Sequence, residues 1–174
     1  MSRNKKTTKW AKTHLNDIYV QKSKKDHYRS RAAYKLHEIN DKYKILKNVK
    51  SVVDLGCAPG SWLQVLKEHK NINFLIGIDL LDVKPMQDIT IFECDIRDSE
   101  KVSQIFSKYN FLLDLVISDI APNITGISDI DQSNFSEIAE TIKDFCKSRL
   151  KVGGTMVMKY FLGSSFDETL NSLD

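Results

Sequence analysis

The stretch Ser51-Val-Val-Asp-Leu-Gly-Cys-Ala-Pro-Gly60 joins an apolar run to a turn that contains two glycines. The apolar run predicts a buried strand over 51–54, and the small residues from 56 to 60 predict a tight turn into a helix over 61–70. A strand, a glycine-containing turn and a helix in this order are typical of the first unit of a parallel α/β sheet.

Apolar segments and helical patterns alternate along the rest of the chain. Further buried strands are predicted at 74–79, 90–94, 113–119 and 155–161. Apolar residues recur at helical spacing from Phe135 to Phe145, and Gly153-Gly154 is expected to close that helix. Upstream, Ser30 can cap a helix over 31–43, in which Ala32, Leu36, Ile39 and Tyr43 fall on one apolar face. The alternation predicts an α/β fold with a doubly wound, mostly parallel sheet and helices on both faces.

Each predicted strand ends in a charged residue. These residues are Asp54, Asp79, Asp95, Asp119 and Lys159. Because the carboxyl ends of parallel strands meet at one edge, where such sheets bind ligands, we expect these side chains to converge. Crowded charges perturb one another's ionisation, and proteins tolerate that cost mainly around a ligand.

The turn and the second strand also suggest a nucleoside ligand. Asp79 follows Gly60 by 19 residues and could accept hydrogen bonds from both hydroxyls of a ribose. The glycine spacing is neither G-x-G-x-x-G nor G-x-x-x-x-G-K-[ST], which disfavours a nicotinamide dinucleotide and a nucleoside triphosphate.

Length and composition bound the class of protein. With 174 residues, 41% of them hydrophobic and 28% charged, the chain is expected to form one globular domain. Three distant cysteines and four scattered histidines argue against a disulfide framework and a metal site. No apolar run approaches the length of a membrane span, and the N-terminus lacks the apolar stretch of a secretory signal. We expect a soluble, cytoplasmic protein without a metal.

The charge is strongly polarised along the chain. Residues 1–50 hold 15 Lys/Arg against 4 Asp/Glu, a net charge of +11, and residues 51–174 have a net charge of −8. Trp10, Tyr19 and Tyr28 lie among the basic residues, and aromatic faces can stack on bases. We therefore predict a basic RNA-binding arm over 1–30 and a catalytic domain over 31–174; a merely solvated tail is the alternative.

Four motifs carry a resemblance to a known family. They are Arg29-Ser-Arg-Ala-Ala-Tyr-Lys-Leu36, Asp54-Leu-Gly-Cys-Ala-Pro-Gly-Ser-Trp62, Ser118-Asp-Ile-Ala-Pro-Asn123 and Gly153-Gly-Thr-Met-Val-Met-Lys159. Together they resemble FtsJ/RrmJ-type ribose 2′-O-methyltransferases, and the likeness runs from about residue 9 to the end of the chain. It implies a Rossmann-like domain that transfers a methyl group from S-adenosylmethionine to a ribose 2′-hydroxyl, at a uridine of large-subunit ribosomal RNA.

The resemblance also implies functional residues. S-adenosylmethionine would be bound by Gly60, Trp62, Asp79, Asp95 and Asp119. Asp79 would hold the ribose, Asp95 would lie near the adenine, and the turn at 56–60 would leave room for the methionine part. From the residues alone, a core tryptophan at the start of a helix is the preferred interpretation of Trp62.

For catalysis the resemblance implies a Lys-Asp-Lys-Glu tetrad. Lys35, Asp119 and Lys159 match its first three members, with Lys159 as the proton acceptor from the 2′-hydroxyl. The family continues through further strands that carry the glutamate, whereas this chain ends at Asp174, and Glu168 belongs to the wrong segment. We therefore expect a C-terminally incomplete domain with an exposed sheet edge after Lys159.

Three alternatives remain at this stage. The first is 2′-O-methylation of transfer RNA or of an mRNA cap, since related enzymes share the Lys-Asp-Lys arrangement. The second is a noncatalytic RNA-binding or ribosome-assembly protein on the same fold, and the third is a nicotinamide oxidoreductase. We expect a monomer whose partner is ribosomal RNA within the large ribosomal subunit, with no membrane partner.

Overall fold

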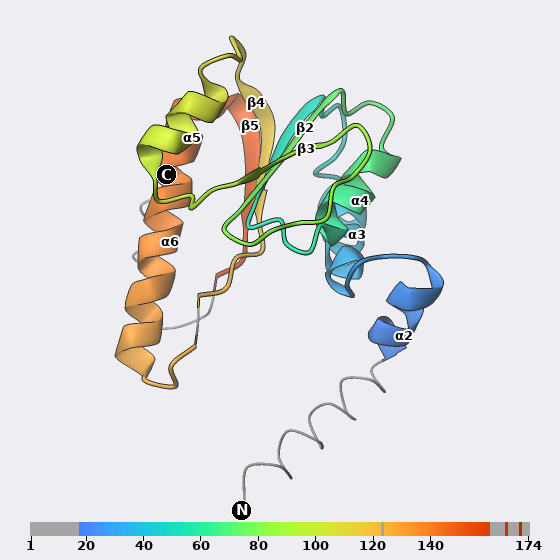
Figure 1. Cartoon of the computed structure of the whole chain (residues 1–174), viewed down its shortest axis with the longest axis horizontal. Coiled ribbons are helices and arrows are strands. Elements are labelled where there is room, and N and C mark those ends of the chain that lie inside the picture. Colours follow the sequence, from blue (N-terminus) through green and yellow to red (C-terminus); the bar gives the residue numbers. More distant parts are fainter. Residues whose placement is uncertain (1–17, 123, 161–165, 167–170, 172–174) are drawn as a thin grey trace, which may run out of the picture.

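The computed structural model describes residues 18–122 and 124–160, together with residues 166 and 171 (Figure 1). Its elements in chain order are α2 (Ile18–Lys25), α3 (Ala32–Tyr43), β1 (Ser51–Leu55), α4 (Ser61–Glu68), β2 (Phe74–Asp79), β3 (Thr90–Glu93), α5 (Ser99–Phe106), β4 (Leu113–Ser118), α6 (Ser128–Arg149) and β5 (Leu150–Met158). The strands of the described part form one sheet in the order β3-β2-β1-β4-β5.

All neighbouring strands in this sheet run parallel, and β1 lies at its centre. The chain moves outward from β1 to β3 on one side and from β4 to β5 on the other, so the order of the strands reverses between β1 and β4. α3 and α4 cover one face of the sheet, and α5 and α6 cover the opposite face (Figure 1). The predicted doubly wound α/β fold is confirmed.

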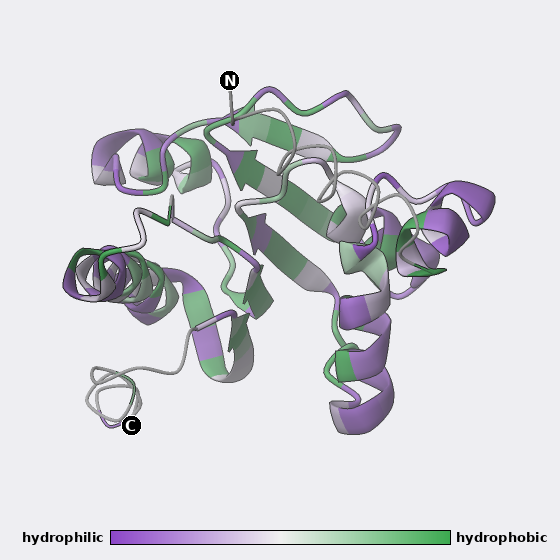
Figure 2. Cartoon of the chain, turned by 90° about the horizontal axis from the view of Figure 1, so that it is seen from below, coloured by the Kyte–Doolittle hydropathy of each residue, from purple (hydrophilic) through white to green (hydrophobic). Residues whose placement is uncertain are grey.

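Successive side chains of β1 point to opposite faces of the sheet and therefore belong to different parts of the core. Val52 packs with Leu36 and Leu115 beneath α3 and α4, whereas Val53 packs with Phe106 and Ile142 beneath α5 and α6. Figure 2 shows the apolar sheet enclosed by helices whose outer surfaces are hydrophilic. All five residues of β1 are buried, and its apolar residues Val52, Val53 and Leu55 fill the core on both faces of the sheet, so this segment decides the fold.

The observed boundaries differ from the predicted ones mainly at β5. Gly153-Gly154 was expected to close the helix over 135–145, but α6 ends at Arg149 and both glycines lie within β5. Leu150 already pairs with Leu113, and the register of β4 and β5 is irregular just beyond that pair. Gly153 adopts a φ of 76° there, so the glycines fit an irregular strand rather than a helix end.

The buried face of α3 also differs from expectation. Ala33, Tyr34 and Leu36 are buried, whereas Tyr43, which the helical spacing placed on the apolar face, is 63% exposed. The reason is that α3 packs against α2 and α4 as well as the sheet: the Tyr34 hydroxyl donates to Asp26, next to α2 (2.7 Å).

Residues 18–30 of the predicted basic arm contact the domain closely. Tyr28 donates a hydrogen bond to Glu68 of α4 (2.6 Å), and Arg29 donates to the carbonyl groups of Pro59, Lys84 and Pro85. The arm boundary at residue 30 remains a prediction, but the described half of the arm is fixed to α4 and to the turn at 56–60. Residues 1–17, with Trp10, lie outside the described residues.

Candidate active site

A cavity of about 600 Å³ opens at the carboxyl edge of the sheet. Residues from the ends of β1, β2, β3 and β4 and from α6 line it, and the charged ones are Asp79, Asp95, Arg97, Asp119 and Glu137. Its volume lies within the usual range for small-molecule sites, and its place where the strand order reverses is where open α/β sheets bind ligands.

Asp79 is fixed at the end of β2 by the backbone. The amide of Ala58 donates to its Oδ2 (2.7 Å) and the amide of Leu81 donates to its Oδ1 (2.8 Å). A carboxylate with one donor on each oxygen keeps further lone pairs free. Because Asp79 also lines the cavity, it can accept hydrogen bonds from a ligand hydroxyl without losing its orientation.

Asp95 forms a two-point ion pair with Arg97 on the cavity wall. Arg97 Nε lies 3.0 Å from Oδ1 and Nη2 lies 2.7 Å from Oδ2, and the Arg97 amide also donates to Oδ1. These hydrogen bonds lower the pKa of Asp95, so the carboxylate stays ionised. Arg97 was not foreseen, although the Asp-x-Arg spacing after β3 could have indicated it.

Lys35, Asp119 and Lys159 meet at one end of this edge. Lys35 Nζ lies 2.7 Å from Asp119 Oδ1, and Lys159 Nζ lies 3.2 Å from the same oxygen. Lys159 Nζ also donates to the Asp119 carbonyl (2.6 Å). Three segments far apart in the sequence therefore bring two cations onto one carboxylate beside the cavity. This arrangement can hold a hydroxyl group by hydrogen bonds, and a lysine of the cluster can accept its proton once that lysine is a neutral amine.

The comparisons with known proteins agree with this geometry. The family model of FtsJ-like methyltransferases matches residues 28–174. The chain belongs to this family. Ribosomal RNA large subunit methyltransferase E of Nitrosospira multiformis is 41% identical over 99% of the chain and 85% of the relative. The protein of that name from Pseudomonas fluorescens is also 41% identical, over 98% of the chain and 82% of the relative.

A solved structure shows the same fold. The ribosomal RNA methyltransferase of Plasmodium falciparum matches with a TM-score of 0.75 and 33% identity, over 83% of this chain and 85% of that one. The present chain is therefore a methyltransferase of the FtsJ-like family, as the four sequence motifs implied.

The structure does not place Trp62 or Gly60 of this FtsJ-like domain on the cavity wall. Trp62 is 4% exposed and donates its indole N–H to the Ala32 carbonyl (2.8 Å), which is the core position that the residues alone favoured; its contact with the donor stays a prediction. Gly60 precedes α4 with a φ of 103°, where a side chain would meet the Arg29 guanidinium.

Gly56 makes the close approach that the turn was expected to provide. It lines the cavity with a φ of 77°, and a Cβ atom there would lie 2.0 Å from the Ile120 side chain. Only glycine fits this conformation and this space. The turn thus keeps the backbone next to the cavity, where the larger part of a nucleoside-containing ligand can lie against it.

Asp54 lies behind the cavity rather than in it. Its carboxyl group is 1% exposed, and no group in the described part of the chain donates a hydrogen bond to Oδ2. Burial, followed by repulsion from Asp119 and Asp79, raises the pKa of Asp54 well above its usual value. Of the charged strand ends, the structure brings four to the ligand edge and leaves this one buried beneath it.

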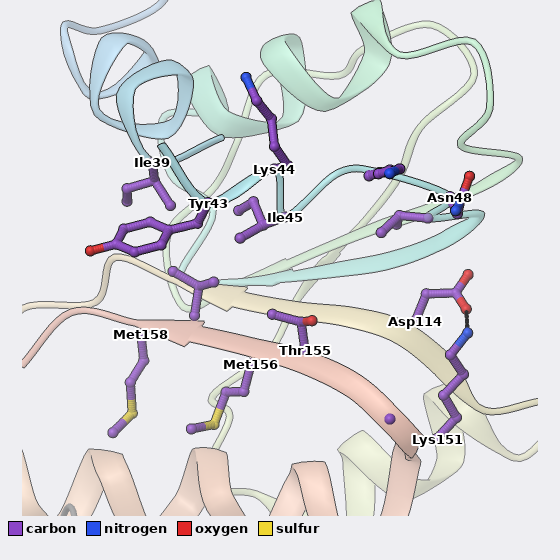
Figure 3. Close-up of a pocket in the computed structure, with 14 residues that line it drawn as sticks. Ile39, Tyr43, Lys44, Ile45, Asn48, Asp114, Lys151, Thr155, Met156 and Met158 are labelled. Atoms are coloured by element: carbon purple, nitrogen blue, oxygen red, sulfur yellow. Dashed lines mark hydrogen bonds and ion pairs between the residues drawn. The ribbon is translucent and has the colours of Figure 1, made fainter. Parts of the chain in front are cut away.

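A second cavity, of about 820 Å³, lies between α3 and β5 (Figure 3). Ile39, Tyr43 and Ile45 face it from above and Thr155 faces it from β5, while Asp114 and Lys151 form an ion pair at one end. None of the predicted site residues lines it. It lies beside β5, the outermost strand of the sheet in the described part of the chain.

Two further findings concern the described residues. No group of three or more His, Cys, Asp or Glu side chains is arranged there to hold a metal ion. None of the helices described is long and apolar enough to cross a membrane.

Proposed function

We propose that this methyltransferase transfers the methyl group of S-adenosylmethionine to the 2′-hydroxyl of a ribose, at a uridine, in large-subunit ribosomal RNA. The observation that carries the proposal is the Lys35-Asp119-Lys159 cluster at the rim of a nucleoside-sized cavity. The relatives named above as large-subunit ribosomal RNA methyltransferases support this choice of RNA.

The residues of the cavity fit the donor. Asp79 is proposed to accept hydrogen bonds from the donor ribose, Asp95 to lie near the adenine, and Asp119 to close the site toward the reacting groups. Gly56 leaves space for the methionine part. When bound, S-adenosylmethionine supplies a methyl group on a positively charged sulfur, which leaves as a neutral thioether.

Trp62 and Gly60 are proposed to act on the donor site indirectly. Trp62 ties the first residue of α3 to α4, and the Lys35 ammonium lies 5.9 Å from the centre of its indole ring. Ser30 and Ser61 share a second hydrogen bond between the same segments (2.7 Å). Trp62 thus positions Lys35, and Gly60 admits Arg29, which holds the turn at 56–60.

The lysine cluster supplies the proton transfer. Bound S-adenosylmethionine would supply its methyl group to the 2′-oxygen, and Lys159, as a neutral amine that has first given one proton to solvent, accepts the hydroxyl proton at Nζ. Asp119 then stabilises the ammonium that forms, at the 3.2 Å distance found in the structure. Lys35 holds the Asp119 carboxylate in place and balances its charge.

The basic N-terminal region is proposed to bind the RNA. Lys22, Lys24 and Lys25 are exposed on α2, and Lys22 lies over the ring of Tyr34 (4.5 Å). α2 leads into the segment that carries Lys35, so phosphates held there lie on the side of the domain that presents the cluster. An enzyme with this substrate is expected to act in the cytoplasm, and we propose that it acts as a monomer.

Transfer of labelled methyl groups tests the substrate. The protein is incubated with labelled S-adenosylmethionine and, in parallel, with undermethylated large ribosomal subunits, transfer RNA and capped mRNA. We expect label in large-subunit ribosomal RNA only. Label found only in transfer RNA or in the mRNA cap would show that the proposed substrate is wrong. Calorimetric binding of NAD instead of S-adenosylmethionine would indicate an oxidoreductase.

A further inference from the structure

Asp54 occupies the middle of three carboxyl groups at the carboxyl edge of the sheet. It lies in β1, opposite Gly77 of β2 and Ile117 of β4. Asp79 ends the strand on one side, and Asp119 follows the strand on the other side. The proposed mechanism uses both of these neighbours but gives Asp54 no role.

The three carboxyl groups differ in their partners. Asp79 accepts two backbone N–H groups and Asp119 accepts two lysine ammonium groups, whereas Asp54 Oδ2 has no donor in the described part of the chain. An isolated carboxylate buried in this way costs several kcal/mol, so such a group keeps its proton. Burial without a donor on Oδ2 therefore disfavours the ionised form of Asp54.

The groups around Asp54 offer no permanent counter-charge. Asp79 and Asp119 repel its anion, and the Cys57 thiol beside it is itself held neutral, because burial and then Asp54 and Asp79 raise its pKa. Lys35 and Lys159 are bound to Asp119. Arg29 donates to three carbonyl groups. Among the described residues these cations are already engaged, and a bound ligand can bring a positive charge to the Asp54 anion.

We propose that Asp54 makes the donor site selective for charge: it is a neutral acid in the donor-free protein and loses its proton to solvent when a sulfonium donor binds in the adjoining cavity. This rests on the proposed function. Gly56, two residues beyond Asp54, lines the cavity, and so do Asp79 and Asp119. A cation there acts on the buried carboxyl through a medium of low polarity, where Coulomb interactions are strong.

The consequence is discrimination between donor and product. After transfer the thioether product carries one positive charge fewer, so it stabilises the Asp54 anion less. Binding of the donor then releases more protons than binding of the product. By linkage, the preference of the site for the donor over the product increases with pH until Asp54 is ionised in both states.

Calorimetry in two buffers measures the released protons. S-adenosylmethionine and S-adenosylhomocysteine are titrated into the protein at one neutral pH, in buffers that differ in ionisation enthalpy. We expect the wild type to release about half to one proton more with the donor than with the product. In Asp54→Asn that excess should be lost, while the exposed Asp88→Asn variant, which carries the same substitution at the surface, should retain it.

The outcomes separate this inference from the proposed function. Donor binding with equal proton release for both ligands, or an undiminished difference in Asp54→Asn, overturns the role of Asp54 alone. No binding of S-adenosylmethionine overturns the proposed function as well. If Asp54→Asn does not fold, Asp54→Ser takes its place, because it removes the same titrating carboxyl group with a smaller side chain. The amine of each ligand titrates in every protein alike, so it cannot imitate a difference between variants.

Discussion

The Lys35 ammonium lies 2.7 Å from Asp119 Oδ1, although 84 positions separate the two residues. The contact joins α3 to the loop after β4 across the edge of the sheet, and Lys159 completes it from β5. A helix that precedes the sheet in sequence thus contributes a cation to the site at which the central strands end.

We expect Lys35→Ala to lower the rate of methyl transfer by about tenfold or more, because Asp119 loses one of its two cations and its fixed orientation. The affinity for S-adenosylmethionine should change little. Single-turnover kinetics and calorimetry measure the two effects separately. Lys42→Ala, an exposed lysine on the same helix, is the control, and an equal loss of rate in that variant would contradict a specific role of Lys35.

Lys159→Ala should abolish turnover while it leaves donor binding nearly intact. General-base catalysis contributes about 10²–10⁴ in rate, so the defect should be at least a hundredfold. Lys159→Arg preserves the charge but cannot accept a proton at neutral pH. If Lys159→Arg keeps single-turnover transfer within about tenfold of wild type, Lys159 orients the hydroxyl and is not the base.

Asp79→Ala should weaken the binding of S-adenosylmethionine by about tenfold to a hundredfold, which corresponds to the loss of roughly 1.5–3 kcal/mol from hydrogen bonds to a charged acceptor. Calorimetry on the folded variant gives the affinity, and Asp88→Ala serves as a control for loss of a nearby exposed carboxylate. Unchanged affinity in Asp79→Ala would refute its place in the donor site.

Replacement of Lys22, Lys24 and Lys25 by glutamine should reduce the salt dependence of RNA binding. With fewer phosphate contacts, fewer counterions are released when the RNA binds. The affinity for S-adenosylmethionine should stay the same. The matched control replaces three exposed lysines on the α5 and α6 side of the molecule, Lys101, Lys108 and Lys147. A salt slope equally reduced in both triple variants would mean that the charge on α2 is only solvated.

Asp114 should stabilise the fold above pH 4 and lose this effect in acid. Burial opposes its ionisation, but hydrogen bonds from Lys151 and from the amides of Lys50 and Ser51 outweigh burial and lower the pKa of Asp114 to about 2. Since the pKa is depressed in the folded state, the contribution of about 2 kcal/mol is present above the unfolded pKa and disappears as the pH falls toward 2.

Denaturant unfolding of Asp114→Asn against wild type at pH 7 and at pH 2 measures this contribution. We expect the variant to be the less stable protein at pH 7, and the difference should shrink strongly at pH 2. A difference that is the same at both pH values would show that ionisation of Asp114 does not stabilise the fold.

The sequence predicted the sheet well because its signals are local. Apolar runs such as 74–79 became strands with the expected bounds, and the charged residues after them fall at one edge because parallel strands end together. β5 was predicted too short, since its first half contains two glycines whose place is set by pairing with β4, which is a long-range contact.

The candidate site was less accessible to local reasoning. Nothing in the spacing of α3 indicates that Lys35 reaches Asp119, and only the family resemblance suggested it. Trp62 and Asp54 show that closeness in sequence does not fix the position of a side chain. Both lie beside the turn at 56–60 in sequence, yet packing turns the indole toward Ala32 and leaves the Asp54 carboxyl beneath the cavity. Which side of a turn a residue occupies is decided by tertiary packing.

The position of the transferred methyl group tests the central claim most directly. Large ribosomal subunits from cells that lack this enzyme are methylated with labelled S-adenosylmethionine, and their RNA is digested to nucleosides and analysed by mass spectrometry. The account predicts that the label appears in a single 2′-O-methylated nucleoside, a uridine. Label on a base, or no label in large-subunit RNA while the protein binds the donor, would contradict it.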